Sequence, residues 1–293
     1  MRIFVTGANG FTGHHFVSMA VGQGHEVVPF EGNLGDVEGI KSQLRKAQPQ
    51  WVVHLAAIAF VNHGDPGAVY DVNVVGTTNL LDALCSLEDL PSKVLLTSSA
   101  NIYGNSSEPL ISEEQAPAPV NHYAMSKLAM EYMARNYQSA LPILFARPFN
   151  YTGAGQSDLF IIPKLVSHFV ASAPFVELGN LDVEREFNDV RMVCDAYLGL
   201  LEAGQAGETY NICTGRPFSL REVISILEEI TGHSPEIRVN PKFVRASEVR
   251  SLAGNPAKLL DVVSLMNKPD LRQTLEWMIA YYKDMAVKAP TSH

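Results

Sequence analysis

Cysteine is scarce in this 293-residue chain. Its three cysteines, Cys85, Cys194 and Cys213, lie far apart, and none belongs to a CxxC pair or to a Cys/His spacing typical of zinc. A disulfide framework and a structural metal site are therefore not indicated, and we predict no bound metal. We interpret the three thiols as buried core residues in a reducing compartment.

Long apolar runs and basic clusters are also lacking. No hydrophobic run reaches the ~18 residues of a membrane-spanning helix, and residues 1–5 lead directly into an expected strand. We therefore expect neither a signal peptide nor a membrane span, and we predict a cytoplasmic protein. The net charge of −9, with scattered Lys and Arg, argues against a nucleic-acid partner, because a phosphate backbone requires a basic stripe.

Short apolar runs that alternate with helical patterns are the main feature present. Strands are expected at 2–6, 26–30, 51–56, 93–98 and 141–146, and helices at 11–20, from Asp65-Pro66 onward, and at 190–203, 220–231 and 271–287. Between 150 and 190 we expect loops around Gly153, Gly155, Pro163 and Pro174. Strands that alternate with helices predict an α/β fold, with a doubly wound Rossmann parallel sheet and a smaller mixed α/β C-terminal lobe. We assign residues 1–150 to a dinucleotide-binding domain, to which 188–215 return, and 151–293 to a substrate-binding lobe.

A glycine-rich loop follows the first expected strand and opens the first helix. Its glycines, Gly7, Gly10 and Gly13, stand where a dinucleotide fold needs a tight turn, a close approach to pyrophosphate, and close helix–strand packing. Glu31, at the end of the second strand, can accept a hydrogen bond from the adenosine 2′-hydroxyl and would repel a 2′-phosphate. No Arg follows within ten residues, so we predict NAD in preference to NADP.

Tyr123 and Lys127 form the second chemical signal. A spacing of four places both side chains on one face of a helix, with Cβ atoms about 5–6 Å apart. A phenol has an ordinary pKa of ~10, and a nearby ammonium favours its ionised form, so we expect Lys127 to lower the pKa of Tyr123. Hydride transfer to a ketone develops alkoxide character and needs such a proton donor. A nicotinamide-dependent sugar or carbonyl enzyme is the leading hypothesis.

Further motifs join these two: HLAA at 54–57, NVVGT at 73–77, TSSANIYG at 97–104 and NHYAMSK at 121–127. With them the chain resembles the extended short-chain dehydrogenases that act on nucleotide sugars. The resemblance implies that Ser99 hydrogen-bonds the reacting oxygen, that Tyr123 is the acid/base, and that Lys127 tunes Tyr123 and holds the nicotinamide ribose. The cofactor contacts that it implies are Gly7, Asn9, Gly10, Phe11, Gly13, Glu31, Asn33, Leu34, Leu55, Ala56, Ala57, Tyr123, Lys127 and Pro148.

Segments of the second lobe, at 147–156, 179–185 and 244–249, are similar to the GDP-mannose branch of this family. That branch holds GDP-mannose 4,6-dehydratases and the reductases of GDP-4-keto-6-deoxy-mannose, so 151–293 would bind a nucleotide sugar. The resemblance implies that Asn150 contacts the ligand near its phosphates and that Arg185 pairs with the pyrophosphate. It further implies that Arg245 and Glu248 address the nucleoside, and we add Asn101 to the expected substrate contacts.

The residue at position 101 separates the reactions of this branch. A 4,6-dehydratase removes a proton from C5 with a carboxylate, and in those enzymes a Glu follows the Ser/Thr by two positions, where this chain has Asn101. A neutral amide cannot act as that base. We therefore predict reduction of the 4-keto group of a GDP-4-keto-6-deoxy-hexose, as in GDP-rhamnose synthesis. A nucleotide-sugar 4-epimerase with tightly bound NAD stays open as the alternative, and a non-catalytic cofactor-sensing protein is less well supported.

Two further expectations concern packing. Helices at 66–85 and 121–138 carry apolar positions such as Val72, Leu80, Leu128 and Met133, which exceed what one sheet face requires. In relatives these two helices form the four-helix bundle of a dimer, so we predict a homodimer.

We interpret His54 as a core or backbone-bonded imidazole beside the cofactor.

Overall fold

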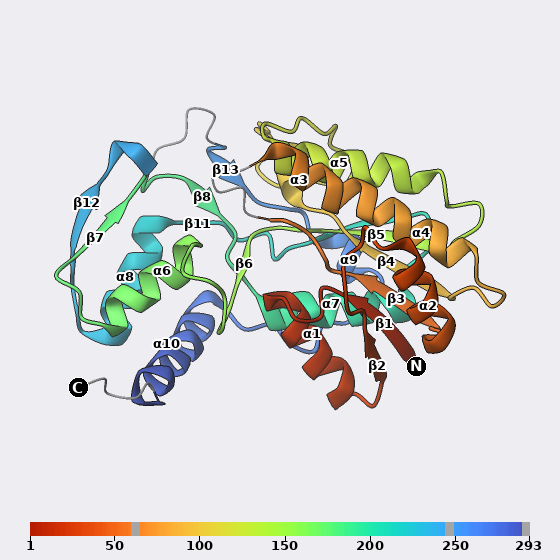
Figure 1. Cartoon of the computed structure of the whole chain (residues 1–293). Helices are drawn as coiled ribbons and strands as arrows, with labels where there is room; N and C mark the ends of the chain where they lie inside the picture. The colour runs from red at the N-terminus through yellow and green to blue at the C-terminus, as the bar shows by residue number, and fades with distance from the viewer. Residues whose placement is uncertain (60–64, 244–248, 289–293) are drawn as a thin grey trace.

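The computed structural model describes residues 1–59, 65–243 and 249–288, apart from the side chains of Ala286 and Lys288. Its centre is a six-stranded parallel sheet of strand order β10-β5-β4-β3-β1-β2 (Figure 1). The strands are β1 (Arg2–Thr6), β2 (Glu26–Pro29), β3 (Trp51–His54), β4 (Lys93–Thr97), β5 (Ile143–Pro148) and β10 (Thr209–Ile212). The chain runs from β1 to β2 on one side and on to β3, β4 and β5 on the other, so the predicted doubly wound α/β core is confirmed.

Helices cover both faces of this sheet. On one face lie α1 (Phe11–Gly22) and α7 (Val190–Ala203), and on the other lie α2 (Val37–Ala47), α4 (Gly76–Cys85) and α5 (His122–Arg135). Neighbouring residues of a strand point to opposite faces: Ile3 and Val5 pack beneath α1 and α7, whereas Phe4 packs beneath α2 and α4. Burial on both faces explains why the runs 3–5, 51–53, 94–96 and 143–146 within the central strands are apolar.

Local signals set the helix starts. At α3 (Pro66–Tyr70), Asp65 accepts a hydrogen bond from the N–H of Gly67 (2.7 Å), and proline occupies the first turn, as predicted. The helix continues through a π-helical turn, η1 (Asp71–Val75), into α4. At α5 the side chain of Asn121 accepts from the N–H of Ala124 (2.9 Å). This cap fixes where the helix that carries Tyr123 begins.

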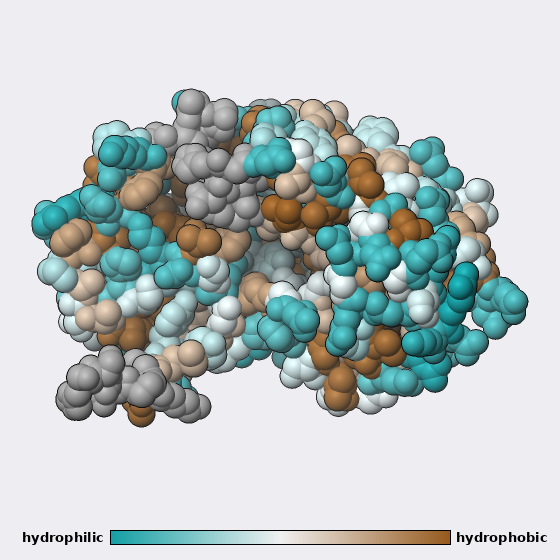
Figure 2. All heavy atoms as spheres, viewed as in Figure 1, coloured by the Kyte–Doolittle hydropathy of each residue, from teal (hydrophilic) through white to brown (hydrophobic). Residues whose placement is uncertain are grey.

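The smaller part of the molecule, at the left of Figure 1, is built around three helices, α6 (Ile161–Val170), α8 (Leu220–Thr231) and α10 (Leu271–Lys288). Short strands surround them: β7 (Phe175–Leu178) pairs with β12 (Glu236–Val239), and β8 (Glu184–Arg185) lies between β11 (Phe218–Ser219) and β13 (Ser251–Leu252). A turn, η3 (Pro241–Phe243), follows β12. Figure 2 shows the surface hollowed between the two parts.

The expectation of loops around Pro163 is wrong, because this residue lies in the first turn of α6. Proline is tolerated there since its missing N–H would have no partner within the helix. The chain reaches α6 from the main sheet through β6 (Tyr151–Thr152), which pairs with β9 (Asn188–Asp189) just before α7. Later, α9 (Ala257–Leu260) packs against β10, and its Leu259 joins the core beneath α7. The larger part therefore takes segments from beyond residue 188.

The expected burial of the thiols is confirmed for Cys194 and Cys213 but is wrong for Cys85, which is exposed at the last residue of α4. Across the described residues, no helix has the length and apolar character needed to cross a membrane. The same stretch of chain holds no group of three or more His, Cys, Asp or Glu side chains placed to bind a metal ion.

The two ends of α1 differ sharply in the space available for a side chain. A Cβ at Gly13 would lie 2.1 Å from the carbonyl oxygen of Gly7 and 2.5 Å from that of Ala8, whereas a Cβ at Gly22 would meet nothing within 4 Å. We expect Gly13→Ala to lower the free energy of unfolding by about 1–3 kcal/mol, because rigid backbone must move apart. The matched change Gly22→Ala should be neutral or slightly stabilising. Urea unfolding followed by circular dichroism measures both, and equal stability of the two variants would contradict this packing.

Candidate active site

A cavity of about 380 Å³ opens at the carboxyl ends of β1, β2 and β3. It is lined by Gly7, Ala8, Asn9, Gly10, Phe30, Glu31, Gly32, Leu34 and Ala56. The chain crosses from one side of the sheet to the other at this point, and doubly wound sheets bind their ligands at such a switch in strand order. The cavity is therefore the candidate dinucleotide site.

The glycine loop forms one wall of this cavity with bare backbone. Gly7 has a φ of 72°, and a Cβ there would lie 2.6 Å from the backbone nitrogen of Ala56. Gly10 is the N-cap of α1 and provides no capping side chain, whereas α2, α5, α7 and α8 each begin with one. The first-turn N–H groups of α1 are thus left for an anion such as a pyrophosphate. These features fit a dinucleotide.

Glu31 lies on the rim of the cavity, next to Gly32. Its backbone is held from α2 by the amide of Gln43: the Glu31 N–H donates to Gln43 Oε1 (3.0 Å), and Gln43 Nε2 donates to the Glu31 carbonyl (2.6 Å). A carboxylate held at this place can accept hydrogen bonds from ribose hydroxyls.

The predicted reaction residues come together beside the sheet. After β4, Ser99 caps a short 3₁₀ helix, η2 (Ala100–Tyr103), and its Oγ accepts hydrogen bonds from the backbone N–H (3.2 Å) and side-chain Nδ2 (3.1 Å) of Asn101. The hydroxyl of Ser99 is in turn hydrogen-bonded to that of Tyr123, on α5. Ser99, Asn101 and Tyr123 therefore form one polar cluster.

The electrostatics of Tyr123 differ from the sequence prediction. Burial raises the pKa of Tyr123 above its ordinary value, and the hydrogen bond with Ser99 offsets only part of that rise. The net direction is thus opposite to the expected lowering by Lys127. The reason is tertiary: sequence spacing shows the neighbouring ammonium but not the burial, which opposes the phenolate.

Lys127 is 3% exposed, and its Nζ donates to the carbonyl oxygen of Thr97 (2.8 Å), at the end of β4. Burial lowers the pKa of Lys127 to about 8, while the charge of Glu131 acts in the opposite direction. The ammonium is therefore anchored to the carboxyl edge of the sheet, at the base of the cluster that holds Tyr123.

A chain of buried hydrogen bonds links the glycine loop to α5. His54 lies between the hydroxyls of Thr6 (2.6 Å to Nδ1) and Thr77 (2.9 Å to Nε2), and Thr77 donates to the carbonyl of Asn73. The side-chain amide of Asn73, within η1, donates to Ser126 Oγ (2.9 Å) on α5. His54 is thus a core imidazole, as interpreted, although its partners are side chains rather than backbone.

The predicted substrate residues are only partly described. Asn150 is exposed, and its carbonyl accepts from the N–H of Asn188 (2.9 Å). Arg185 is half-buried, and its guanidinium donates to the carbonyls of Val249 and Arg250, so it ties β8 to the segment before β13. Arg245 and Glu248 lie outside the described residues. The substrate roles of all four, and of Asn101, stay predictions.

Six of the predicted cofactor residues line the cavity, namely Gly7, Asn9, Gly10, Glu31, Leu34 and Ala56. Sequence reasoning missed Ala8, Phe30 and Gly32, although each adjoins a predicted residue. The other predicted residues do not line it. Leu55 and Ala57 flank Ala56, Gly13 packs under the loop, Phe11 stacks on Tyr151, Asn33 accepts from the N–H of Gly35, and Pro148 ends β5.

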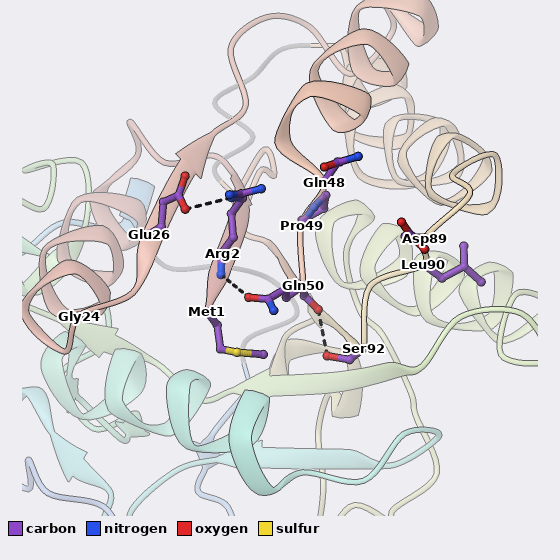
Figure 3. Close-up of a pocket in the computed structure, with 10 residues that line it drawn as sticks. All are labelled: Met1, Arg2, Gly24, Glu26, Gln48, Pro49, Gln50, Asp89, Leu90 and Ser92. Atoms are coloured by element: carbon purple, nitrogen blue, oxygen red, sulfur yellow. Dashed lines mark hydrogen bonds and ion pairs between the residues drawn. The ribbon is translucent and has the colours of Figure 1, made fainter.

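A larger hollow of about 670 Å³ lies at the opposite, amino-terminal edge of the sheet (Figure 3). Residues that line it are joined to one another: Arg2 forms a salt bridge with Glu26 (3.0 Å), and the Arg2 N–H donates to Gln50 Oε1 (2.9 Å). It shares no residue with the glycine cavity. None of the predicted catalytic, cofactor or substrate residues that the structure describes lines this hollow.

The fold and the site together define a dinucleotide-dependent oxidoreductase with a Ser/Tyr/Lys cluster. Residues 3–213 match the NAD dependent epimerase/dehydratase family. Over 272 residues, covering 90% of this chain and 91% of the relative, the sequence is 39% identical to GDP-6-deoxy-D-talose 4-dehydrogenase of Aggregatibacter actinomycetemcomitans. It is 34% identical over 295 residues, 95% of this chain and 96% of the relative, to GDP-6-deoxy-D-mannose reductase of Pseudomonas aeruginosa.

Among solved structures, RMD from Pseudomonas aeruginosa complexed with NADPH superposes with a TM-score of 0.90 at 32% identity, covering 97% of this chain and 99% of that one. The chain belongs to the NAD dependent epimerase/dehydratase family, and it is an NAD(P)-dependent oxidoreductase of the extended short-chain dehydrogenase type. The resemblance drawn from the sequence motifs is confirmed.

Proposed function

We propose that this protein reduces the 4-keto group of a GDP-4-keto-6-deoxy-hexose with a nicotinamide cofactor. The observation that carries the proposal is the cluster of Ser99, Tyr123 and Lys127 at the carboxyl edge of the sheet, beside the glycine cavity. The choice of a GDP sugar is supported by the two relatives, whose names are those of a GDP-6-deoxy-talose dehydrogenase and a GDP-6-deoxy-mannose reductase.

The residues suit proton donation to a ketone oxygen. A nicotinamide cofactor held by the backbone of the glycine loop would supply the hydride for C4 of the sugar. Tyr123 donates its hydroxyl proton to the C4 oxygen, and the raised pKa of Tyr123 keeps that proton in place at neutral pH. Ser99 Oγ accepts two hydrogen bonds from Asn101, so the serine has one hydrogen to donate. That hydrogen serves Tyr123 in the structure and would turn to the developing oxyanion when substrate is bound. Lys127 stabilises the phenolate that Tyr123 becomes.

The position of Asn101 supports a reductase rather than a dehydratase. Its side-chain amide donates to Ser99 Oγ (3.1 Å), so it orients the serine and offers no basic oxygen for proton abstraction at C5. A 4-epimerase would use the same three residues and differ in retaining its cofactor. The two reactions differ in a measurable way: a reductase oxidises its cofactor, whereas a 4-epimerase takes the hydride back and leaves the cofactor unchanged overall.

A substrate assay tests the proposal directly. Purified protein, reduced nicotinamide and GDP-4-keto-6-deoxy-mannose should give stoichiometric cofactor oxidation, measured by absorbance, and a GDP-6-deoxy-hexose product. The corresponding dTDP and UDP keto sugars should react at least about tenfold more slowly, since the proposed nucleoside contacts select guanine. Interconversion of C4 epimers without net cofactor oxidation would establish the epimerase instead.

In the same assay Tyr123→Phe should lose about 10²–10⁴-fold in kcat, because the proton donor is absent. Cofactor affinity, measured by fluorescence titration, should change little, since the phenyl ring remains. A Tyr123→Phe protein that retains the parent kcat would exclude Tyr123 as the acid and favour a sensing role.

We further propose that NADH is preferred over NADPH, although RMD from Pseudomonas aeruginosa was solved with NADPH. Glu31 on the cavity rim is the supporting observation. Glu31→Ala should reduce kcat/KM for NADH by about tenfold, the loss of one charge-assisted hydrogen bond, and leave NADPH equal or improved. Glu38→Ala, an exposed carboxylate on α2 that does not line the cavity, is the control. Equal use of both cofactors by the parent would refute this preference.

We also propose a homodimer formed by the helical stretch 66–85, which comprises α3, η1 and α4, together with α5. Leu80 is fully buried in the core, so it does not contribute, but Val75, Met125 and Tyr132 are 50%, 43% and 63% exposed on η1 and α5. Tyr132→Glu should convert a dimer into a monomer in light scattering, because it places a charge in an apolar interface. Met266→Glu, at a residue 75% exposed elsewhere, should leave the mass unchanged. A monomeric parent would contradict the dimer.

A further inference from the structure

The inner face of α5 carries three ionisable side chains at intervals of four residues: Tyr123, Lys127 and Glu131. Residues four apart are neighbours on a helix surface, so each of the three lies next to the following one. Lys127 is 3% exposed and Glu131 is 1% exposed. The helix therefore places a carboxylate one turn beyond the lysine, in the protein interior.

Arg147, 5% exposed on β5, holds this carboxylate by two hydrogen bonds: Nε to Oε1 (2.9 Å) and Nη2 to Oε2 (2.7 Å). Its remaining nitrogen, Nη1, donates to the Tyr103 hydroxyl (2.8 Å) and to the Glu113 carbonyl (3.3 Å). A bidentate guanidinium–carboxylate pair fixes the orientation of both groups. Glu131 consequently cannot turn away from α5.

The ionisable side chains near Lys127 come from three elements. Its own helix carries Tyr123 and Glu131, β5 carries Arg147, and β3 carries His54. Burial lowers the pKa of His54 to about 3, and the charge of Lys127 acts in the same direction. His54 is thus neutral at physiological pH. Glu131 is the anion of this set, and its charge favours the protonated lysine, which burial disfavours.

Stability alone does not account for the buried pair of Glu131 and Arg147. Replacing such a pair with well-packed apolar side chains is often neutral or stabilising, because both ions lose their hydration on burial. An effect of the Glu131 carboxylate on the protonation of the neighbouring Lys127 accounts for the buried pair better than stability does. Lys127 must be a cation to stabilise the phenolate formed when Tyr123 gives up its proton.

We propose that Glu131, held in place by Arg147, is a positioning residue that keeps Lys127 protonated at the pH of the reaction. This inference rests on the proposed reductase function for its purpose, but the protonation of Lys127 can be measured without turnover. Glu131 acts through Lys127 and itself touches neither substrate nor cofactor.

NMR of lysine labelled with ¹³C and ¹⁵N tests the proposal, with the Lys127 signal identified by its absence from the spectrum of Lys127→Met. In the parent the signal should titrate near pH 8, in line with the lowered pKa of Lys127. Glu131→Gln should move this midpoint down by about one unit, a tenfold change in the protonation equilibrium. Glu113→Gln is the control, because Arg147 contacts the backbone carbonyl of Glu113 whereas the half-buried Glu113 carboxylate accepts from the N–H of Asn211 (2.7 Å). This variant should leave the midpoint where it is.

Glu131→Gln leaves Arg147 without its partner and can unfold the protein. The double variant Glu131→Gln/Arg147→Met avoids this and should shift the midpoint downward by a smaller amount, because a positive charge is removed as well. The alkaline limb of kcat/KM for sugar reduction should move with the NMR midpoint. An unmoved midpoint in both the single and the double variant would overturn the proposal. An inactive parent would instead refute the reductase function and leave the NMR result readable.

Discussion

Close contact between bare stretches of backbone is the constraint on which this molecule depends. The turn after β1 packs against the start of the loop after β3, where Gly7 contacts the backbone of Ala56. Helix α1 packs against the same turn at Gly13. Any side chain at Gly7 or Gly13 would separate these segments. Because they meet where the sheet reverses its strand order, the same contact that closes the core also leaves the N-terminus of α1 open to a phosphate.

Polar groups then connect this backbone contact to the chemistry. The chain of hydrogen bonds from Thr6 through His54 and Asn73 to α5 is buried, so each partner is strongly held in a setting where an unmade hydrogen bond is costly. It fixes α5 relative to the glycine loop. Tyr123 and Lys127 are positioned as a consequence, and this chain of bonds connects the strand before the glycine loop to the helix of the proton donor.

The fold and much of the site could be predicted from short-range patterns. Periodicity located α7 and α8 at their observed bounds, and the Asp65-Pro66 pair marked the start of α3. The helix spacing of Tyr123 and Lys127 was enough to place them on one face. The expectation of a loop at Pro163 failed for a local reason, because proline is tolerated in the first turn of a helix. Where two distant segments meet, the sequence was silent: the pairing of Gln43 with Glu31 has no local signal.

Residue order by itself determined the α/β class, the glycine loop and the placement of Tyr123 and Lys127 on one helix face, because these follow from local spacing. The role of Ser99 was implied by the resemblance to a known family. Only the tertiary structure decided the electrostatics. It showed that burial raises the pKa of Tyr123 and that Arg147, from a strand, faces Glu131 on α5. The reason is physical: the pKa of a side chain depends on its desolvation and on every charge around it, and both are set by segments that meet only after the chain has folded.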